Sequence, residues 1–374
     1  MIRILHCVSK MDRAGQETFI MNVYRQIDRE KFQFYFLCTN HSKGDFDDEI
    51  KELGGKIFYL PQNKIFSGVN RYLKQIEILA VWLADNKKDF DIVHLHTYHA
   101  LDVFVHLEAA RRAKIKNVVI HSHNTNGPHK VVHYIFRIVN NMYKHRMLAC
   151  SEEAGKWLHG NINMKKGRVG VAYNGIDVPS FKYNEDARND YRRILNIQGK
   201  KVIGHIGRFN YQKNHDFIIE IMKSAIKINK DIVLLLIGKG ERFEEIKQKV
   251  NNEKLDKNII ILGSRDDIPE LLSTMDALLF PSLFEGLSVV LVEAQASGLQ
   301  CLISDNILPP EEDVVKNIFT KCSLKENSIV WAKKLLSIVE KNEQRIVANH
   351  IMEQSQFNIL STVNYLEDFY SKQV

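Results

Sequence analysis

Two glutamates bracket one of the most apolar segments of this 374-residue chain, which reads FEGLSVVLVEA over residues 284–294. An isolated carboxylate in an apolar interior is costly or has a raised pKa. Glu285 and Glu293 are therefore expected to hold a polar ligand between them. Carboxylates accept hydrogen bonds from pairs of sugar hydroxyls, so a sugar joined to a ribose through a diphosphate would suit both. The alternative is structural, with Glu285 as a helix-dipole partner and Glu293 in a salt bridge.

The segment between the glutamates is predicted to be a helix from Leu287 to Ser297. It follows a strand that ends near Phe280 and a turn at 284–286, and Gly298 would end it. The β-branched residues make a strand the rival interpretation, but the sequence EAQASG favours a helix. A helix that is apolar on nearly all sides is a buried one. Glu285 then lies at its amino end, and Glu293 about 12 Å further along, at ~1.5 Å per residue.

Basic residues and glycines follow the first predicted strand of each half. In the second half, HIGRFNYQKNH (205–215) contains Gly207, Arg208 and Lys213. Free amides at a helix start attract anions, and Arg and Lys nearby would bind a diphosphate. Taken alone, these two cations also suit an ordinary solvated loop. In the first half, SKMDRAGQETF (9–19) is a turn that opens into a helix, with Gly15 near the helix start.

Two other motifs contain residue types that bind metal ions. VVIHSHNTNGPH (118–129) places His121 and His123 just past a strand end, where their spacing directs both to one face. A neutral histidine that donates a hydrogen bond to the ligand is favoured over a metal site, because no third ligand is evident; a structural role is the competing interpretation. The D-x-D string in GDFDDE (44–49) lies on a polar turn and is predicted to face solvent. No metal site is predicted.

Short β-branched runs alternate with amphipathic segments, which is typical of βα units around a parallel sheet. The alternation of predicted strands and helices starts again after the polar stretch 173–200. The predicted fold class is therefore α/β, with two Rossmann-like doubly wound domains that face each other across a cleft. The expected boundaries are 1–175, 176–354, and a helical tail at 355–374 that packs back on the first domain. The predicted strands are 2–8, 34–38, 57–60, 92–95, 118–120, 147–150, 202–206, 232–237, 259–262, 277–280 and 301–303.

Composition narrows the class of protein. Apolar residues make up 45% and charged residues 26% of the chain, as in a soluble globular protein, and no apolar run reaches the ~20 residues of a membrane span. The net charge of +7 suits phosphorylated substrates or an anionic membrane, whereas nucleic-acid motifs are lacking. The scattered cysteines indicate buried, reduced thiols in a cytoplasmic protein; they are Cys7, Cys38, Cys150, Cys301 and Cys322.

Together these motifs resemble the retaining glycosyltransferases of group 1, family 4 (GT4), which have the GT-B fold, especially enzymes of bacterial capsule and exopolysaccharide synthesis. The resemblance runs essentially end to end. It rests on MDRAGQETFIMNVYRQIDREKFQFYFL, VIHSHNT, YNGID, GHIGRFNYQKNH, LIGKGE, LGSRDDIPELL and FPSLFEGLSVVLVEAQASGLQCLISD. The last segment contains the E-x7-E pattern, which is highly specific for the family.

The resemblance implies a role for each matched residue of the E-x7-E segment. Glu285 corresponds to the glutamate that contacts donor-sugar hydroxyls near the anomeric carbon. Gly286, Leu287 and Ser288 would supply backbone amides there, and Glu293 would bind the ribose.

Outside that segment, Arg208 and Lys213, beside Gly207, would neutralise the leaving diphosphate, and His123 would help to hold the donor sugar. Gly15 matches a glycine turn that approaches the phosphates. That turn is usually a double glycine, and here its first position is Ala14, which costs little if its φ is negative.

The implied activity is transfer of a hexose or N-acetylhexosamine from a nucleoside diphosphate sugar, most plausibly a UDP-sugar, to a hydroxyl of a glycan or lipid-linked acceptor, with retention and without a metal or other cofactor. A polyprenyl-diphosphate acceptor would place the enzyme on the inner face of the plasma membrane. The basic, aromatic segment 129–146 would suit such a surface or would be an ordinary packed helix. The alternatives are a sugar-nucleotide epimerase, a phosphorylase, or a non-catalytic sugar-nucleotide-binding scaffold.

Overall fold

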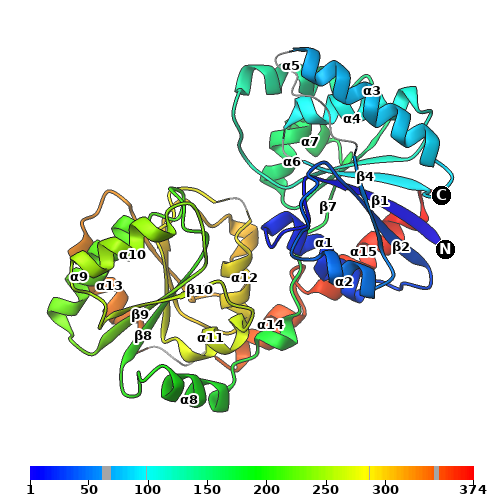
Figure 1. Cartoon of the computed structure of the whole chain (residues 1–374). Helices are drawn as coiled ribbons and strands as arrows, with labels where there is room; N and C mark the ends of the chain where they lie inside the picture. Colours follow the sequence, from blue (N-terminus) through cyan, green and yellow to red (C-terminus); the bar gives the residue numbers. More distant parts are fainter. Residues whose placement is uncertain (61–68, 98, 286, 341–344) are drawn as a thin grey trace. The chain divides into compact units, whose positions relative to one another are not determined.

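The computed structural model of the chain describes residues 1–60, 69–97, 99–285, 287–340 and 345–374 (Figure 1). These residues form two units, one of Met1–Gly175 with Ile359–Val374 and one of Ile176–Asn358. Each unit is built on one parallel sheet covered by helices, so the predicted α/β fold class is confirmed.

The first unit has a seven-stranded sheet in the order β3-β2-β1-β4-β5-β6-β7. Its central strands β1, β2, β4 and β5 are almost fully buried, which explains why they read as largely apolar runs. Helices α1, α2 and α15 share a core on one face, and α3, α4 and α6 on the other. The strands are Ile2–Val8, Phe32–Cys38, Lys56–Tyr59, Ile92–Thr97, Val118–Ser122, Arg146–Ala149 and Val169–Val171; the helices are α1 Gly15–Gln26, α2 Asp47–Glu52, α3 Val69–Asn86, α4 Ala100–Arg112, α5 Lys130–Asn140, α6 Glu152–His159, α7 Asn161–Lys165 and α15 Ile359–Ser371.

The C-terminal helix α15 packs beside α1, as predicted for the tail (Figure 1). Its apolar side chains Ile359, Val363 and Leu366 are buried in the first unit. Tyr370 near its end is fully buried and reaches the sheet, where its hydroxyl lies 2.8 Å from His94 Nδ1. The last turns of the chain are therefore part of the first unit's core.

The second unit has a six-stranded sheet in the order β10-β9-β8-β11-β12-β13. Helices α9, α10 and α13 share one core with it. The strands are β8 Lys201–Ile206, β9 Ile232–Ile237, β10 Ile259–Gly263, β11 Ala277–Phe280, β12 Cys301–Ser304 and β13 Phe319–Cys322; the helices are η1 Val178–Phe181, α8 Glu185–Ile194, α9 His215–Ile228, α10 Phe243–Asn252, α11 Ile268–Thr274, α12 Val289–Ala296, η2 Pro310–Glu312, α13 Ser328–Ile338 and α14 Val347–Glu353.

Three further predictions can be compared with the structure. All five cysteines are buried, as expected, and none forms a disulfide. The D-x-D string was predicted to face solvent, and this is wrong for its second acid: Asp45 is exposed, but Asp47 is buried, because it begins α2 and accepts a 2.6 Å hydrogen bond from the Tyr59 hydroxyl. Among the described helices, none is both long and apolar enough to cross a bilayer.

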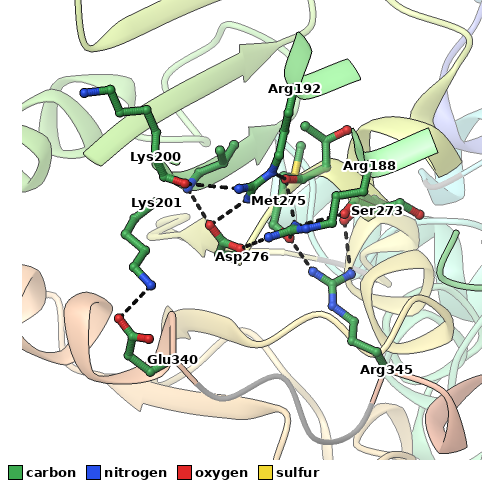
Figure 2. A network of polar contacts seen from close by, with 12 residues as sticks. Arg188, Arg192, Lys200, Lys201, Ser273, Met275, Asp276, Glu340 and Arg345 are labelled. Atoms are coloured by element: carbon green, nitrogen blue, oxygen red, sulfur yellow. Dashed lines mark hydrogen bonds and ion pairs between the residues drawn. The ribbon is translucent and has the colours of Figure 1, made fainter. Parts of the chain in front are cut away.

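Helix α8 has no buried residue and is held by charge instead (Figure 2). Asp276, which precedes β11 and is buried, binds Arg188 and, at 2.8 Å, Arg192, both from α8. The same carboxylate accepts the Val202 amide at 2.7 Å. Arg345, also buried, donates to the carbonyls of residues 272, 275 and 297. One carboxylate thus joins α8, β8 and β11 at the amino ends of the strands.

We expect Asp276→Asn to destabilise the second unit by about 3 kcal/mol, because removing one partner of a buried ion pair leaves the other charge uncompensated. Thermal unfolding should then shift down by about 8 °C. The matched control is Asp231→Asn, which breaks the exposed 2.7 Å pair with Lys200 and should leave the melting temperature unchanged. Equal melting temperatures for the two variants would contradict this account.

Candidate active site

The second unit changes its winding direction at β8. Strand β9 lies on one side of β8 and β11 on the other. Ligands of doubly wound sheets bind beyond the carboxyl ends of the strands at such a switch point. The loops that leave β8 and β11 there are 207–214 and 281–288, which contain most of the residues singled out from the sequence.

An ion pair joins the two loops. Lys213 Nζ lies 2.7 Å from Glu285 Oε1, and the side chains are only 12% and 6% exposed. Gln212 Nε2 donates to the other carboxylate oxygen at 3.2 Å and to the carbonyl of Phe284 at 2.8 Å. The amide of Leu283 donates to the carbonyl of Gln212 at 2.9 Å. Glu285 is therefore held in one orientation by both a cation and the opposite loop.

The neighbours of Lys213 direct its side chain across the switch point. Its ammonium lies 4.3 Å from the centre of the Phe280 ring at the end of β11. A Cβ at Gly207 would come within 3.0–3.2 Å of the Lys213 side chain, so glycine there leaves room for it. Arg208, next to Gly207, is exposed, and its side chain has no hydrogen-bond or ion-pair partner in the part of the chain that the structure describes. It is free to bind an anion.

Helix α12 is buried, as predicted, but begins two residues later than expected. Ser288 occupies the N-cap position, and its side chain does not bond to the amides of the first turn. These amides therefore remain available to an anion or a sugar oxygen. Leu287 is half-buried beside Ser288, whereas Gly286 lies outside the described residues.

Glu293 lies on α12, half-buried, and its carboxyl has no hydrogen-bond or ion-pair partner among the described residues. Burial raises the pKa of Glu293 to about 8. The predicted structural alternative, a salt bridge, is absent from the described part of the chain. An unpartnered carboxyl at this depth is the arrangement expected of a group whose partner is a ligand.

A third carboxyl group, that of Glu312, lies near Glu285 and was not predicted from the sequence. Glu312, in η2 after β12, is 1% exposed, and its carboxyl group faces the backbone amide of Ser288 without a hydrogen bond of good geometry to any described residue. Burial, assisted by the negative charges of Glu311 and Glu285, raises the pKa of Glu312 to about 8. The pattern PPEED resembles a surface turn, so the sequence contains no signal for this buried acid.

In the first unit, Gly15 is the first residue of α1, directly after the loop that leaves β1. Ala14 before it has φ −125°, so alanine is unstrained where a second glycine was expected, in agreement with the condition set from the sequence. Apart from its chain neighbours and the backbone of α1, no atom of the described residues lies within 4 Å of a Cβ built at Gly15. The protein's own packing therefore does not require this glycine.

Gly15→Ala tests whether a ligand approaches this turn. Because the added methyl group meets no protein atom and alanine favours helix, we expect unchanged or slightly higher stability. A ligand phosphate packed against the turn would meet the methyl group, so nucleotide-sugar affinity should fall about tenfold, measured by titration calorimetry. Unchanged affinity would separate Gly15 from the site.

His123 follows β5 and packs against α1, its ring 5.5 Å from that of Phe19. It is half-buried, and burial lowers its pKa to about 3, so the ring is neutral. His121 lies beside it with ring centres 4.3 Å apart, as the one-face prediction requires. His123 Nε2 is 2.8 Å from Nδ1 of His96, a residue that the sequence analysis did not single out. The sequence feature that could have identified His96 is the H-x-H pattern of β4, which is the same as the pattern formed by His121 and His123.

Comparisons with known proteins cover nearly the whole chain. Residues 187–353 match the family model described as glycosyl transferases group 1, and residues 13–179 match that of glycosyltransferase family 4. EpsF of Bacillus subtilis, a protein named as a glycosyltransferase, is 36% identical over 338 residues. The aligned residues cover 88% of this chain and 86% of EpsF.

Two more distant relatives are covered over almost their full length. The capsular polysaccharide biosynthesis glycosyltransferase CapH of Staphylococcus aureus is 25% identical, with 99% of both chains covered. The Escherichia coli UDP-Gal:alpha-D-GlcNAc-diphosphoundecaprenol alpha-1,3-galactosyltransferase is 24% identical, with 99% of this chain and 96% of that protein covered.

Among solved structures, Anabaena HepE in complex with UDP and glucose superposes with a TM-score of 0.79 at 17% identity, over 99% of this chain and all of HepE.

Proposed function

Since this chain belongs to the group 1, family 4 glycosyltransferases, retaining enzymes that use nucleotide-sugar donors, we propose that it transfers a hexose or N-acetylhexosamine from a UDP-sugar to a hydroxyl of a lipid-linked glycan. The process served would be synthesis of a capsule, an exopolysaccharide or another surface polysaccharide. The observation that carries this proposal is the Lys213–Glu285 pair at the switch point, together with Arg208 of the same loop, whose side chain has no partner among the described residues. Cations and a carboxylate there match the two ends of a sugar diphosphate.

The donor would lie along the switch point of the second unit. Arg208 and Lys213 would bind the diphosphate, with Gly207 admitting the Lys213 side chain. The carboxyl of Glu293, which lacks a partner among the described residues, would accept the ribose hydroxyls. Glu285 would accept hydroxyls of the transferred sugar.

Backbone amides at Leu287 and Ser288, at the start of α12, would complete the donor site, together with that of Gly286, which lies outside the described residues. From the first unit, Gly15 would approach the phosphates. His123 would donate to the sugar, because its buried Nδ1 has no partner in the described residues.

In the reaction, the bond between the anomeric carbon and the diphosphate oxygen breaks, and the electron pair leaves with the diphosphate. Arg208, Lys213 and the helix-end amides neutralise that negative charge, so the step requires no divalent ion. The acceptor hydroxyl attacks the anomeric carbon from the same face, and its proton passes to the departing phosphate oxygen. The charge of Glu285 favours the cationic sugar of the transition state.

The names of two similar proteins support the nucleotide and the acceptor. The Escherichia coli relative is named for a UDP-galactose donor and a diphosphoundecaprenol-linked acceptor, and HepE was crystallised with UDP and glucose. We expect UDP release from a panel of UDP-sugars only when a lipid-linked acceptor extract is present. Tight donor binding, seen as a raised melting temperature, without turnover on any extract would favour the scaffold alternative.

An acceptor of this kind implies contact with an anionic membrane, and α5 has the surface for it. Between Glu108 and Glu152 the chain has eight Lys or Arg residues and no Asp or Glu. Val131, Ile138 and Met142 are 73%, 72% and 83% exposed. An open groove of about 1030 Å³ beside α5 combines apolar and basic lining, including Tyr134, Ile138, Ile162, Arg137 and Arg168. Exposed apolar side chains among cations suit a bilayer of anionic lipid.

Liposome co-sedimentation tests the membrane contact. At low salt the protein should pellet with vesicles containing anionic lipid and much less with neutral ones. Ile138→Glu should abolish pelleting, whereas the control Ile194→Glu, at an isoleucine of α8 that is 70% exposed, should not. No pelleting of the unmodified protein at low salt rejects membrane docking and leaves the transferase proposal standing.

A further inference from the structure

Five histidines lie on one face of the first unit's sheet. His6 is on β1, His94 and His96 are on β4, and His121 and His123 are at the end of β5 and just beyond it. Alternate residues of a strand face the same side, and β4 lies between β1 and β5, so the five rings form one row. The first four are at most 5% exposed. The row leads from the core under α15 to His123 at the proposed donor site.

Two hydrogen bonds join three of these rings into a chain. His6 Nδ1 lies 2.8 Å from His96 Nε2, and His96 Nδ1 lies 2.8 Å from His123 Nε2. His96 therefore uses both ring nitrogens. Burial lowers the pKa of His6 and His123 to about 3 and that of His96 well below its ordinary value, so all three rings are neutral.

Neutral rings make the chain directional. A neutral imidazole has one N–H donor and one acceptor nitrogen, so the proton position on one ring fixes that on the next. If His6 donates to His96, then His96 donates to His123 Nε2, and the proton of His123 must be on Nδ1. Either order leaves one buried N–H without a partner in the described residues, that of His123 Nδ1 in the first order and that of His6 Nε2 in the reverse. The first order is favoured because His123 is half-buried, where a ligand can supply an acceptor, whereas His6 is only 2% exposed.

We propose that His96, supported by His6, is a positioning residue that holds His123 in one ring orientation and with its proton on Nδ1, directed at the donor sugar. The inference rests on the proposed function through the role of His123. Nδ1 of His123 is buried and has no partner among the described residues, so a sugar hydroxyl would satisfy it. A ring fixed before the sugar binds loses little orientational freedom when it binds.

The other two histidines pack against the three hydrogen-bonded rings but do not take part in their hydrogen bonds. His94 bonds through Nδ1 to Tyr370 of α15 at 2.8 Å and stacks on His96 with ring centres 4.2 Å apart. Both ring nitrogens of His121 lack a partner in the described residues. Nitrogens of His96, His121 and His123 lie within 4.8 Å of one another, close enough for a metal ion. A metal there would take a nitrogen of His96 that the hydrogen-bond chain uses, so the two arrangements exclude each other.

Substitutions at His96 separate the two ends of the ring. Asparagine places an amide near Nδ1, which faces His123, whereas glutamine places one near Nε2, which faces His6. We expect His96→Asn to keep kcat/KM for the UDP-sugar within about threefold, and His96→Gln and His96→Phe to lose about tenfold, as for one hydrogen bond. Affinity for UDP, which lacks the sugar, should change less than twofold in all three. The control His94→Phe alters a ring that packs on His96 but makes none of the hydrogen bonds between the three rings, and it should resemble unmodified protein.

A double-mutant cycle tests whether His96 acts through His123. In a His123→Ala background, His96→Phe should cause no further loss of kcat/KM. Additive losses, or equal losses for His96→Asn and His96→Phe, would show that His96 has only a structural role and overturn the proposal. One metal ion per chain in the purified protein, measured by elemental mass spectrometry, would overturn it as well.

Long-range ¹H–¹⁵N NMR of the imidazoles supplies a readout that needs no enzyme activity. In the unmodified protein and in His96→Asn, His123 should show a single tautomer with the proton on Nδ1, and in His96→Phe a mixture. A mixed or Nε2-protonated His123 in the unmodified protein would contradict the proposed order of hydrogen bonds from His6 through His96 to His123. If the NMR result holds but no UDP-sugar is turned over, the proposed function fails and the positioning of His123 stands.

Discussion

Replacing Glu285 with glutamine is expected to lower kcat about 100- to 1000-fold while UDP binds at least as tightly as before. The two effects have opposite signs because the proposed function gives Glu285 two roles. In the proposed transition state its negative charge lies near the cationic sugar, and glutamine removes that charge. In the free protein the same charge neutralises Lys213 at 2.7 Å, and a diphosphate must compete with it for the ammonium group.

The measurements are donor turnover by UDP release and UDP affinity by calorimetry. Lys213→Met is the informative counterpart, since it removes the cation and should weaken UDP binding as well as turnover. Glu326→Gln, which removes a charge from an exposed position of the same unit, is the control and should behave like the unmodified protein. A Glu285→Gln variant that loses UDP affinity and keeps its kcat would reverse the assignment of the two glutamates.

Most strands of the two sheets could be predicted from the sequence, because buried parallel strands are apolar on both faces. The runs 2–8, 232–237 and 277–280 were predicted to the residue. The two strands that were missed are the last edge strands. Val169–Val171 is three residues long with a central glycine, and Phe319–Cys322 contains a lysine, so neither contains a buried β-branched run.

The site was only partly predictable, because its contacts depend on strand order. Glu285 and Lys213 are 72 residues apart and meet because β11 lies beside β8. His96 and His123 meet because β4 lies beside β5. Local patterns identified chemically suitable residues, but they predicted only a ligand contact for Lys213 and gave no indication of its ion pair with Glu285. Glu312 was missed for a different reason, since its burial follows from packing and not from any local pattern.

Glu293 should show a conflict between stability and binding. Its pKa is raised from 4.5 to about 8 by burial, so the folded protein keeps a proton that the unfolded chain releases. Between these two pKa values the unfolded state binds fewer protons, and stability therefore falls as the pH rises. The penalty is fully developed above the folded-state pKa and absent below that of the unfolded chain. Glu293→Gln cannot ionise and should escape it.

We therefore expect Glu293→Gln to have the same melting temperature as the unmodified protein at pH 5 and a melting temperature about 4 °C higher at pH 9. This shift corresponds to a gain of about 2 kcal/mol in the free energy of unfolding, a value reduced because the side chain is partly exposed. Binding should change the other way. In the proposed donor site, ribose hydroxyls donate to the ionised carboxylate, and losing hydrogen bonds to a charged acceptor should weaken UDP binding about 10- to 100-fold at pH 8. Thermal melts across this pH range and calorimetry measure the two effects.

The unmodified protein supplies the complementary test of Glu293. If the ribose binds Glu293 as proposed, it prefers the ionised carboxylate, which the free protein holds protonated below about pH 8. UDP binding at pH 7 should then release a proton. Calorimetry in two buffers of different ionisation enthalpy counts that proton, and UDP affinity should rise from pH 7 to pH 9. Glu293→Gln should bind UDP without proton release and with a flatter pH dependence. If the variant released the same proton, the titrating group would be another one, with Glu312 the first to examine, since its pKa is also raised to about 8.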